Sequence, residues 1–172
     1  MLDTKKIEIA IQKLRAHEIV ILPTDTVYGF STTMTPQGAK KINHFKKAPL
    51  EKPLIALFAN LEQVEKHVKL TKMTRELLLT PEPTTVISPL LDDSGTLAVR
   101  IVKRPDIQKI IKVLGPLWST SVNFHQEPTI VEKKTIQNNF SEIYFFPDNE
   151  NCQNNAKPSR IFNQLTQQWI RK

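Results

Sequence analysis

The chain has 172 residues, 40% of them hydrophobic and 24% charged, and its 24 Lys and Arg against 17 Asp and Glu give a formal net charge of +7 at pH 7. This composition excludes a wholly disordered chain, and the length predicts one domain, residues 1–172, with its own hydrophobic core. The positive charge favours polyanionic partners or substrates, although many basic proteins bind nothing in particular.

Helical and strand-like patterns alternate along the chain. In chain order, the predicted elements are a helix at residues 4–17, a strand at 19–22, a helix starting at 35–36, a strand at 54–58, one or two helices between 60 and 79, strands at 84–88 and 96–102, a helix starting at 105, and strands at 117–121, 142–146, 160–163 and 167–170. Helices separate the early strands while the later strands lie close together, which predicts an α/β domain with a mixed rather than purely parallel sheet.

Some function classes are excluded by what the sequence lacks. No apolar run approaches the ~20 residues of a membrane helix, and the N-terminus lacks the apolar core of a secretory signal. The single cysteine, Cys152, cannot form an internal disulfide, which predicts a reducing, cytoplasmic environment. With 4 glycines and 4 widely spaced histidines, neither a glycine-rich phosphate loop nor a histidine–cysteine zinc site is expected, and no metal ligands are predicted.

The most informative segment is Pro-Thr-Asp-Thr-Val-Tyr-Gly at residues 23–29, directly after a predicted buried strand. The end of a strand is where an open α/β sheet presents its ligand crevice. There, the hydroxyls of Thr24 and Thr26 and the carboxylate of Asp25 could bind a small polar substrate or, with water, a magnesium ion. The alternative is an ordinary turn in which these side chains satisfy backbone groups.

Four further segments carry polar groups near predicted strands. Residues 46–54 place lysines on a proline-braced loop, where they could neutralise phosphates or merely keep the loop soluble. Arg100 interrupts an apolar strand, so it requires either a structural carboxylate or an anionic ligand. Hydroxyls and an amide occur at residues 118–123, and residues 157–161 form a polar turn. The alternatives for these two segments are a hydroxyl-lined strand face and a surface turn.

In this order, the segments resemble the YrdC family of threonylcarbamoyl-AMP synthases, over nearly the whole chain from about residue 20. The matching segments are residues 23–29 with the family's P-T-D-T-x-Y-G, residues 46–54 with K-x-R-P-x-x-K-P-L, residues 96–100 with T-x-A-V-R, residues 119–123 with S-T-S-A-N, and Pro158-Ser159 with P-S-T-[IV]. The resemblance implies a YrdC-like fold, a twisted open mixed β-sheet flanked by helices.

The resemblance also implies a reaction in which L-threonine, bicarbonate and ATP give threonylcarbamoyl-AMP and pyrophosphate, with Mg²⁺ expected beside the ATP. Such a nucleotidyltransferase supplies the threonylcarbamoyl group to a downstream transferase, which modifies the tRNA adenosine next to the anticodon. Transfer RNA or double-stranded RNA is a further candidate partner. The implied substrate-binding residues are Thr24, Thr26, Lys46, Lys52, Thr96, Arg100, Ser119, Ser121, Asn123, Thr129, Ser159 and Arg171.

Positioning and charge neutralisation would be the main duties of this set. The two threonines of residues 23–29 would contact threonine or its carbamate, and the two lysines would face the phosphates. Arg100 would pair with the carboxylate of threonine. Ser121 and Asn123 would hold the nucleotide and phosphate end, with Thr129, Ser159 and Arg171 as further wall contacts. No general base is assigned, because the carbamate is already an anion.

The sequence also departs from the family pattern. Ala48 stands where the family has an arginine, and the neighbouring Lys47 could supply the charge but not the bidentate fork. Losing one charged phosphate contact would cost ~2–4 kcal/mol of transition-state stabilisation. Residues 80–85 lack the tryptophan and glycine of W-P-G-P-x-T, and Phe-His-Gln at residues 124–126 replaces leucine-serine-glycine.

These departures keep two alternatives open. One is a catalytically impaired RNA-binding protein with the YrdC fold, whose basic face would bind structured RNA through its phosphates. The other is a related carbamoyl-adenylate enzyme with a different acceptor.

Overall fold

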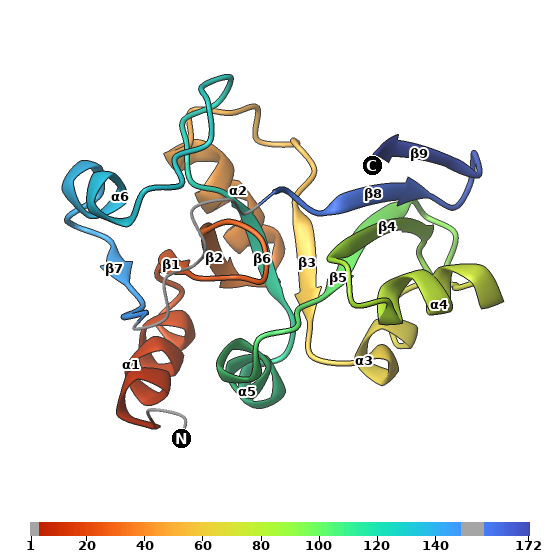
Figure 1. The fold of residues 1–172 in the computed structure, drawn as a ribbon, viewed down its shortest axis with the longest axis horizontal. Coiled ribbons are helices and arrows are strands. Elements are labelled where there is room, and N and C mark those ends of the chain that lie inside the picture. The colour runs from red at the N-terminus through yellow and green to blue at the C-terminus, as the bar shows by residue number, and fades with distance from the viewer. Residues whose placement is uncertain (1–3, 149–156) are drawn as a thin grey trace.

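A twisted sheet forms the centre of the molecule, and helices pack on both of its faces (Figure 1). The structure is a computed structural model that describes residues 4–148 and 157–172. Within these residues the sheet has 9 strands in the order β7-β1-β2-β6-β3-β5-β4-β8-β9.

The strands are β1 (Val20–Leu22), β2 (Gly29–Thr33), β3 (Ile55–Phe58), β4 (Thr84–Pro89), β5 (Thr96–Ile101), β6 (Leu117–Ser121), β7 (Tyr144–Phe145), β8 (Arg160–Asn163) and β9 (Gln168–Arg171). The helices are α1 (Thr4–Arg15), α2 (Pro36–Phe45), α3 (Leu61–Glu65), α4 (Lys72–Leu79), α5 (Pro105–Leu114) and α6 (Lys133–Asn139).

The sheet mixes parallel and antiparallel pairs. β3 runs parallel to β5, β1 to β7 and β4 to β8, whereas the other neighbouring strands of the described sheet are antiparallel. This arrangement confirms the predicted α/β class with a mixed sheet flanked by helices.

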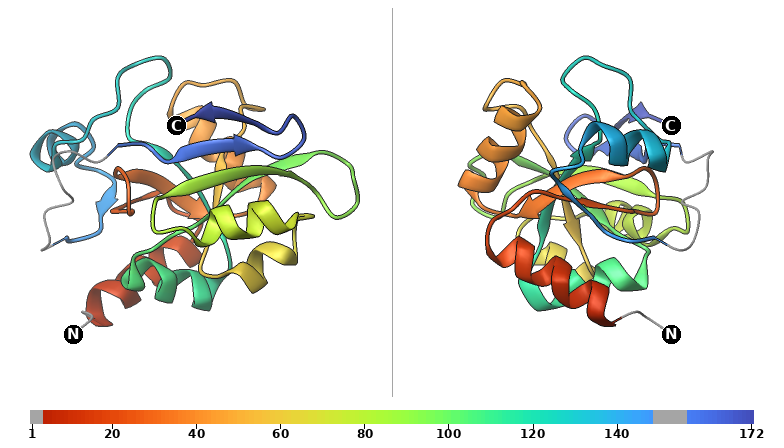
Figure 2. Two further views of the ribbon diagram at one scale, coloured as in Figure 1. Left: turned by 45° about the vertical axis from the view of Figure 1, so that its right-hand side comes forward. Right: turned by 90° about the vertical axis from the view of Figure 1, so that its left-hand side faces the viewer.

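β3 separates two hydrophobic cores because successive side chains of a strand point to opposite faces. Leu57 packs into the cluster formed with α1 and α5, whereas Ala56 and Phe58 pack into the cluster formed with α3 and α4. A third cluster contains the aromatic rings of Phe30 and Phe140, which meet edge to face with their centroids 5.0 Å apart. Figure 2 shows α1 and α5 side by side along one edge of the molecule.

The sequence patterns do not predict β2 or α6. Most of β2 is buried but polar, with Ser31 and Thr32 fully enclosed, so it lacks the apolar run of a core strand. Only Ile136 of α6 is buried, and a single apolar residue gives no helical period. The other predicted elements are confirmed, with ends that differ by a few residues.

In the described part of the chain, none of the helices is long and apolar enough to cross a bilayer. Cys152 lies outside the described residues.

Candidate functional site

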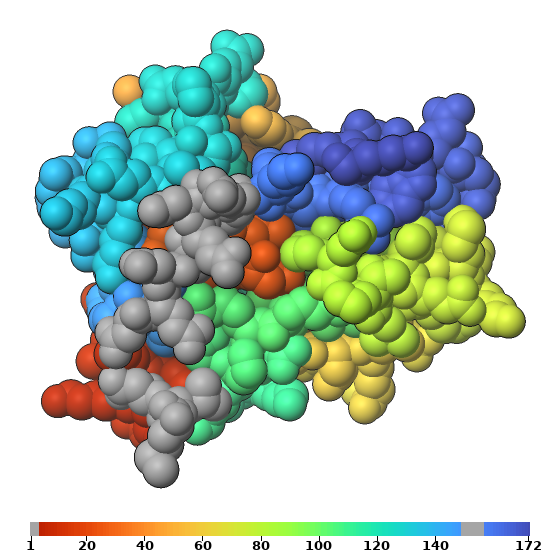
Figure 3. Space-filling view, viewed as in Figure 1, coloured from red at the N-terminus to blue at the C-terminus, as the bar shows by residue number. Residues whose placement is uncertain are grey.

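A cavity of about 320 Å³ opens on the sheet face that carries Leu57. Its walls come from the β1–β2 connection, the starts of β3 and β8, the ends of β6 and β9, and the middle of β4 and β5. In the space-filling view the orange segment between β1 and β2 lies at the floor of a hollow, with blue β8 and β9 beside it (Figure 3). The volume lies at the lower end of the roughly 300–1,000 Å³ typical of small-molecule sites.

Most of the site residues predicted from sequence lie in the cavity wall. Those that line it are Thr24, Thr26, Arg100, Ser119, Ser121, Thr129, Ser159 and Arg171. Those outside the lining are Lys46, Lys52, Thr96 and Asn123. Their roles toward a substrate stay predictions, but five separate segments of the chain do meet at this cavity.

Residues 23–28 form the connection between the antiparallel strands β1 and β2, and a chain of hydroxyl bonds orders it. The Thr24 hydroxyl donates to the carbonyl of Val27 at 2.7 Å. Its oxygen accepts from the Thr26 amide at 3.2 Å and, at 2.9 Å, from the Thr26 hydroxyl, because its own proton is committed to Val27. The turn interpretation is therefore correct for these bonds, and both hydroxyls still line the cavity.

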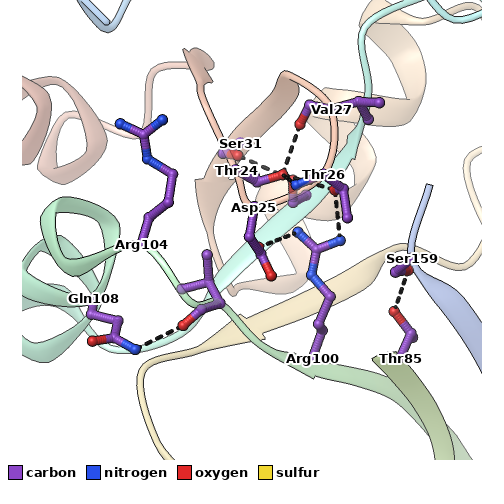
Figure 4. Close-up of polar contacts among 12 residues, drawn as sticks. Thr24, Asp25, Thr26, Val27, Ser31, Thr85, Arg100, Arg104, Gln108 and Ser159 are labelled. Carbon is purple, nitrogen blue, oxygen red and sulfur yellow. Dashed lines mark hydrogen bonds and ion pairs between the residues drawn. The ribbon is translucent and has the colours of Figure 1, made fainter. Parts of the chain in front are cut away.

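Arg100 joins this connection to β5 through a buried charge pair (Figure 4). Its Nη1 donates to Thr26 Oγ1 at 3.0 Å, and its Nη2 lies 3.3 Å from Asp25 Oδ1. Arg100 is 5% exposed, and burial lowers the pKa of its guanidinium while Asp25 opposes that shift. The sequence predicts either a structural carboxylate or an anionic ligand as the partner of Arg100, and the structure shows the carboxylate of Asp25 in this place. Arg100 Nε and Asp25 Oδ2 remain buried without hydrogen-bond partners.

Lys46 lies against the end of β6 and is not itself part of the cavity lining. Its Nζ donates to the carbonyl of Ser121 at 2.6 Å, to Asn123 Oδ1 at 3.0 Å and to Thr120 Oγ1 at 3.2 Å. These bonds use all three ammonium protons and fix the Ser121–Asn123 turn, where the Ser121 hydroxyl also donates to Asn123 Oδ1 at 2.7 Å. Lys46 thus shapes the wall that Ser121 presents to the cavity.

Burial lowers the pKa of Lys46 to about 8, and the charge of Lys52 adds to this effect. Lys46 is only 3% exposed and forms no ion pair with any described carboxylate. An uncompensated buried ammonium is costly, so a nearby anion would be favourable here.

Another part of the cavity wall is formed by β8 together with its two neighbours in the sheet, β4 and β9. The hydroxyls of Ser159 and Thr85 bond each other at 2.8 Å, and Arg171 Nε donates to the Ser159 carbonyl at 2.7 Å. Thr85 was not among the predicted site residues, because a hydroxyl inside a strand is an ambiguous signal. Thr96 is exposed at the start of β5, on the same face of the strand as Ala98 and Arg100 but beyond the lining.

Gly29 is needed for the close approach of β2 to β6. A Cβ at this position would lie 2.5 Å from Ser119 Oγ and 3.3 Å from the carbonyl of Thr120. Any larger residue would push Ser119 aside and narrow the cavity that both residues line.

The departures from the family pattern have visible structural consequences. Lys47 adopts a left-handed backbone (φ 56°), and its Nζ lies 5.0 Å from the centre of the Phe124 ring rather than in the cavity lining. Glu82, which replaces the family's glycine, pairs with Arg160 Nη1 at 2.5 Å and ties the start of β4 to β8. The altered residues 80–85 therefore support the wall that carries Ser159.

The cavity offers few side chains that could hold a metal ion by themselves. Among the described residues there is no group of three or more His, Cys, Asp or Glu that could hold a metal. Mg²⁺ takes few protein ligands when substrate phosphates and water supply the rest.

The chain is similar to known proteins both in sequence and in structure. A family model for Sua5, YciO and YrdC proteins, described as "Telomere recombination", matches residues 12–172. The threonylcarbamoyl-AMP synthase of Vibrio campbellii is 28% identical over 183 aligned positions, covering 98% of this chain and 99% of that protein. P. abyssi Sua5, solved with L-threonine, superposes with a TM-score of 0.82 at 24% identity over 96% of this chain, which spans about half (52%) of that chain. E. coli YciO gives a TM-score of 0.82 at 16% identity, covering 100% of this chain and 91% of that chain.

Proposed function

Because the chain belongs to the Sua5/YciO/YrdC family, we propose that it is an ATP-dependent L-threonylcarbamoyladenylate synthase, which converts L-threonine, bicarbonate and ATP to threonylcarbamoyl-AMP and pyrophosphate. The family assignment confirms the resemblance stated from the ordered motifs. The name of the curated relatives, a nucleotidyltransferase-type activity, agrees with the predicted class of enzyme. The observation that carries the proposal is the convergence of five separate segments on one cavity.

In this reaction the amine of threonine is carboxylated by bicarbonate, with loss of water. An oxygen of the resulting carbamate then attacks the α-phosphorus of ATP, and the bond from that phosphorus to the oxygen bridging to the β-phosphorus breaks, which releases pyrophosphate. A magnesium ion bound to the triphosphate would neutralise part of its charge. The chain itself would orient the two substrates and neutralise the remaining charge.

The proposed roles follow the placement of the groups. The hydroxyls of Thr24 and Thr26 face the cavity beside Arg100, which offers hydrogen bonds and a positive potential to an amino acid carboxylate or a carbamate. Ser121 at the end of β6 also lines the cavity, backed by Lys46 and Asn123, and the phosphates would lie there. The choice of threonine as substrate is supported by P. abyssi Sua5, which was solved with L-threonine.

A direct test incubates the purified protein with ATP, labelled bicarbonate, threonine and magnesium. We expect threonine-dependent pyrophosphate release and a product with the mass of threonylcarbamoyl-AMP. Arg100→Gln should abolish both signals, whereas Arg75→Gln, which removes an exposed arginine paired with Glu65, should leave them unchanged. Release of pyrophosphate that does not depend on threonine would refute the substrate assignment, and competition with other amino acids would identify a different acceptor.

We further propose that the product is used in the cytoplasm to modify the tRNA adenosine next to the anticodon, through a separate transferase. Threonylcarbamoyl-AMP is a mixed anhydride, so a dedicated acceptor must consume it quickly. Adding a candidate transferase and tRNA should convert the released product to modified adenosine, which nucleoside mass spectrometry detects.

A second candidate function is RNA binding with impaired catalysis. It is favoured by Ala48, which removes a guanidinium from the site pattern, and by exposed lysines along and after α2, which form no ion pairs with described residues: Lys40, Lys47 and Lys52. Salt-sensitive tRNA binding without ATP or threonine binding would favour this function over the synthase.

A further inference from the structure

Two lysines without carboxylate partners lie next to residues that line the cavity. Lys46 is buried behind Ser121, and Lys52 immediately precedes Pro53, which lines the cavity. Within the described parts of the chain, neither lysine forms an ion pair. The charge of Lys52 is close enough to oppose protonation of Lys46. Two like charges held together in this way favour an anion with several negative groups.

His125 connects the two ends of the loop that carries these lysines. Its backbone amide donates to the carbonyl of Lys46 at 2.9 Å, and its ring Nδ1 lies 2.9 Å from Lys52 Nζ. The residue lies between Ser121 and Thr129 in sequence, and both of these line the cavity. The imidazole is therefore held against Lys52, in a loop whose two ends contribute Ser121 and Thr129 to the cavity wall.

The lysine fixes the tautomer of the imidazole. An ammonium group only donates hydrogen bonds, so Nδ1 of His125 must accept from Lys52. The proton of the neutral ring then sits on Nε2, which leaves one N–H donor on the side of the ring away from Lys52. A phosphate oxygen beside this pair could accept from Nε2–H and from the remaining protons of Lys52.

We propose that His125 is a further substrate-binding residue, which donates from Nε2 to the β- or γ-phosphate of the nucleotide together with Lys52. This inference rests on the proposed function, since it assigns a contact to the triphosphate of the same site. His125 spans the ends of the segment that contains Ala48, so it offers a donor close to where the arginine of the family pattern is missing. An imidazole donates one hydrogen bond where a guanidinium donates two, so the replacement is partial.

The test measures the affinities of the full chain for ATP and for AMP by calorimetry, with magnesium present. AMP lacks the β- and γ-phosphates, so His125→Ala should weaken ATP binding about tenfold and leave AMP binding unchanged. His44→Ala is the matched control, because His44 is exposed on α2 and forms no described bond to Lys52. Adding Ala48→Arg to His125→Ala should restore ATP affinity more than it improves the wild-type chain.

Each outcome decides a different point. Unchanged ATP affinity in His125→Ala overturns the inference and leaves the synthase proposal intact, whereas failure of the wild-type chain to bind ATP overturns both. Equal losses for ATP and AMP would show that His125 only supports the loop, which also overturns the inference. If His125→Ala fails to fold, His125→Gln retains a side-chain donor and should keep most of the preference for ATP over AMP.

Discussion

The buried pair between Asp25 and Arg100 makes a quantitative prediction for Asp25→Asn. At 3.3 Å and an effective dielectric constant of about 20, two unit charges attract by about 5 kcal/mol. Asparagine keeps an oxygen acceptor for Arg100 but removes the charge, which leaves a cation that is 5% exposed without compensation. We expect a loss of about 3 kcal/mol in the free energy of unfolding, or a fall in Tm of roughly 6–12 °C for a chain of this length.

Thermal and urea unfolding measure this loss. The control is Lys66→Gln, which breaks an ion pair whose side chains are 65% and 79% exposed and should cost less than about 1 kcal/mol. The double variant Asp25→Asn with Arg100→Gln should be less destabilised than the sum of the two single variants, because no unpaired charge remains buried. If Asp25→Asn costs no more than Lys66→Gln, the pair is not desolvated as described and the account of Arg100 fails.

Three further predictions concern the cavity walls. Gly29→Ala should cost about 1–3 kcal/mol of stability and weaken threonine binding, because its Cβ would lie 2.5 Å from Ser119 Oγ, whereas Gly95→Ala, whose Cβ meets nothing closer than 3.9 Å, should be neutral in both assays. The pKa of Lys46 is lowered to about 8 from the ordinary value of 10.5, so between these pH values the unfolded chain binds more protons than the folded one. The free energy of unfolding should therefore rise with pH across this window. Urea titrations at several pH values should show that Lys46→Met removes this part of the rise. Ala48→Arg should raise or preserve pyrophosphate release in the active chain; a clear fall would show that the loop no longer accepts a guanidinium.

The sequence predicts the location of the site better than the bonds within it. Residues 23–29 follow a buried strand, and the structure places Thr24 and residues 26–29 in the cavity wall, at the end of that strand. The position of Arg100 in an apolar strand predicts a buried charge, and in the structure this charge pairs with Asp25. Both predictions depend on local patterns, in which one residue conflicts with its apolar neighbours.

Features that depend on contacts between distant segments are not accessible from these patterns. Ser31 and Thr32 make β2 look like a loop, yet both are buried because β2 lies between β1 and β6. The bond between Ser159 and Thr85 joins positions 74 residues apart, and no local signal indicates it. The bond between Lys52 and His125 spans 73 residues and depends in the same way on how two loops meet.

The distribution of charge around the cavity favours one orientation of the bound substrates. The charge of Arg100 is balanced by Asp25, so the pair can orient a single carboxylate without binding it strongly. By contrast, Lys46 and Lys52, which adjoin the lining residues Ser121 and Pro53, have no acidic partners among the described residues, and this suits a group with several negative charges. A substrate with its amino acid at Arg100 and its polyphosphate near Lys52 would thus be held in one orientation, and the reverse orientation would set a triphosphate against Asp25. Charge reversal at Lys52, as in Lys52→Glu, should therefore weaken ATP binding far more than threonine binding.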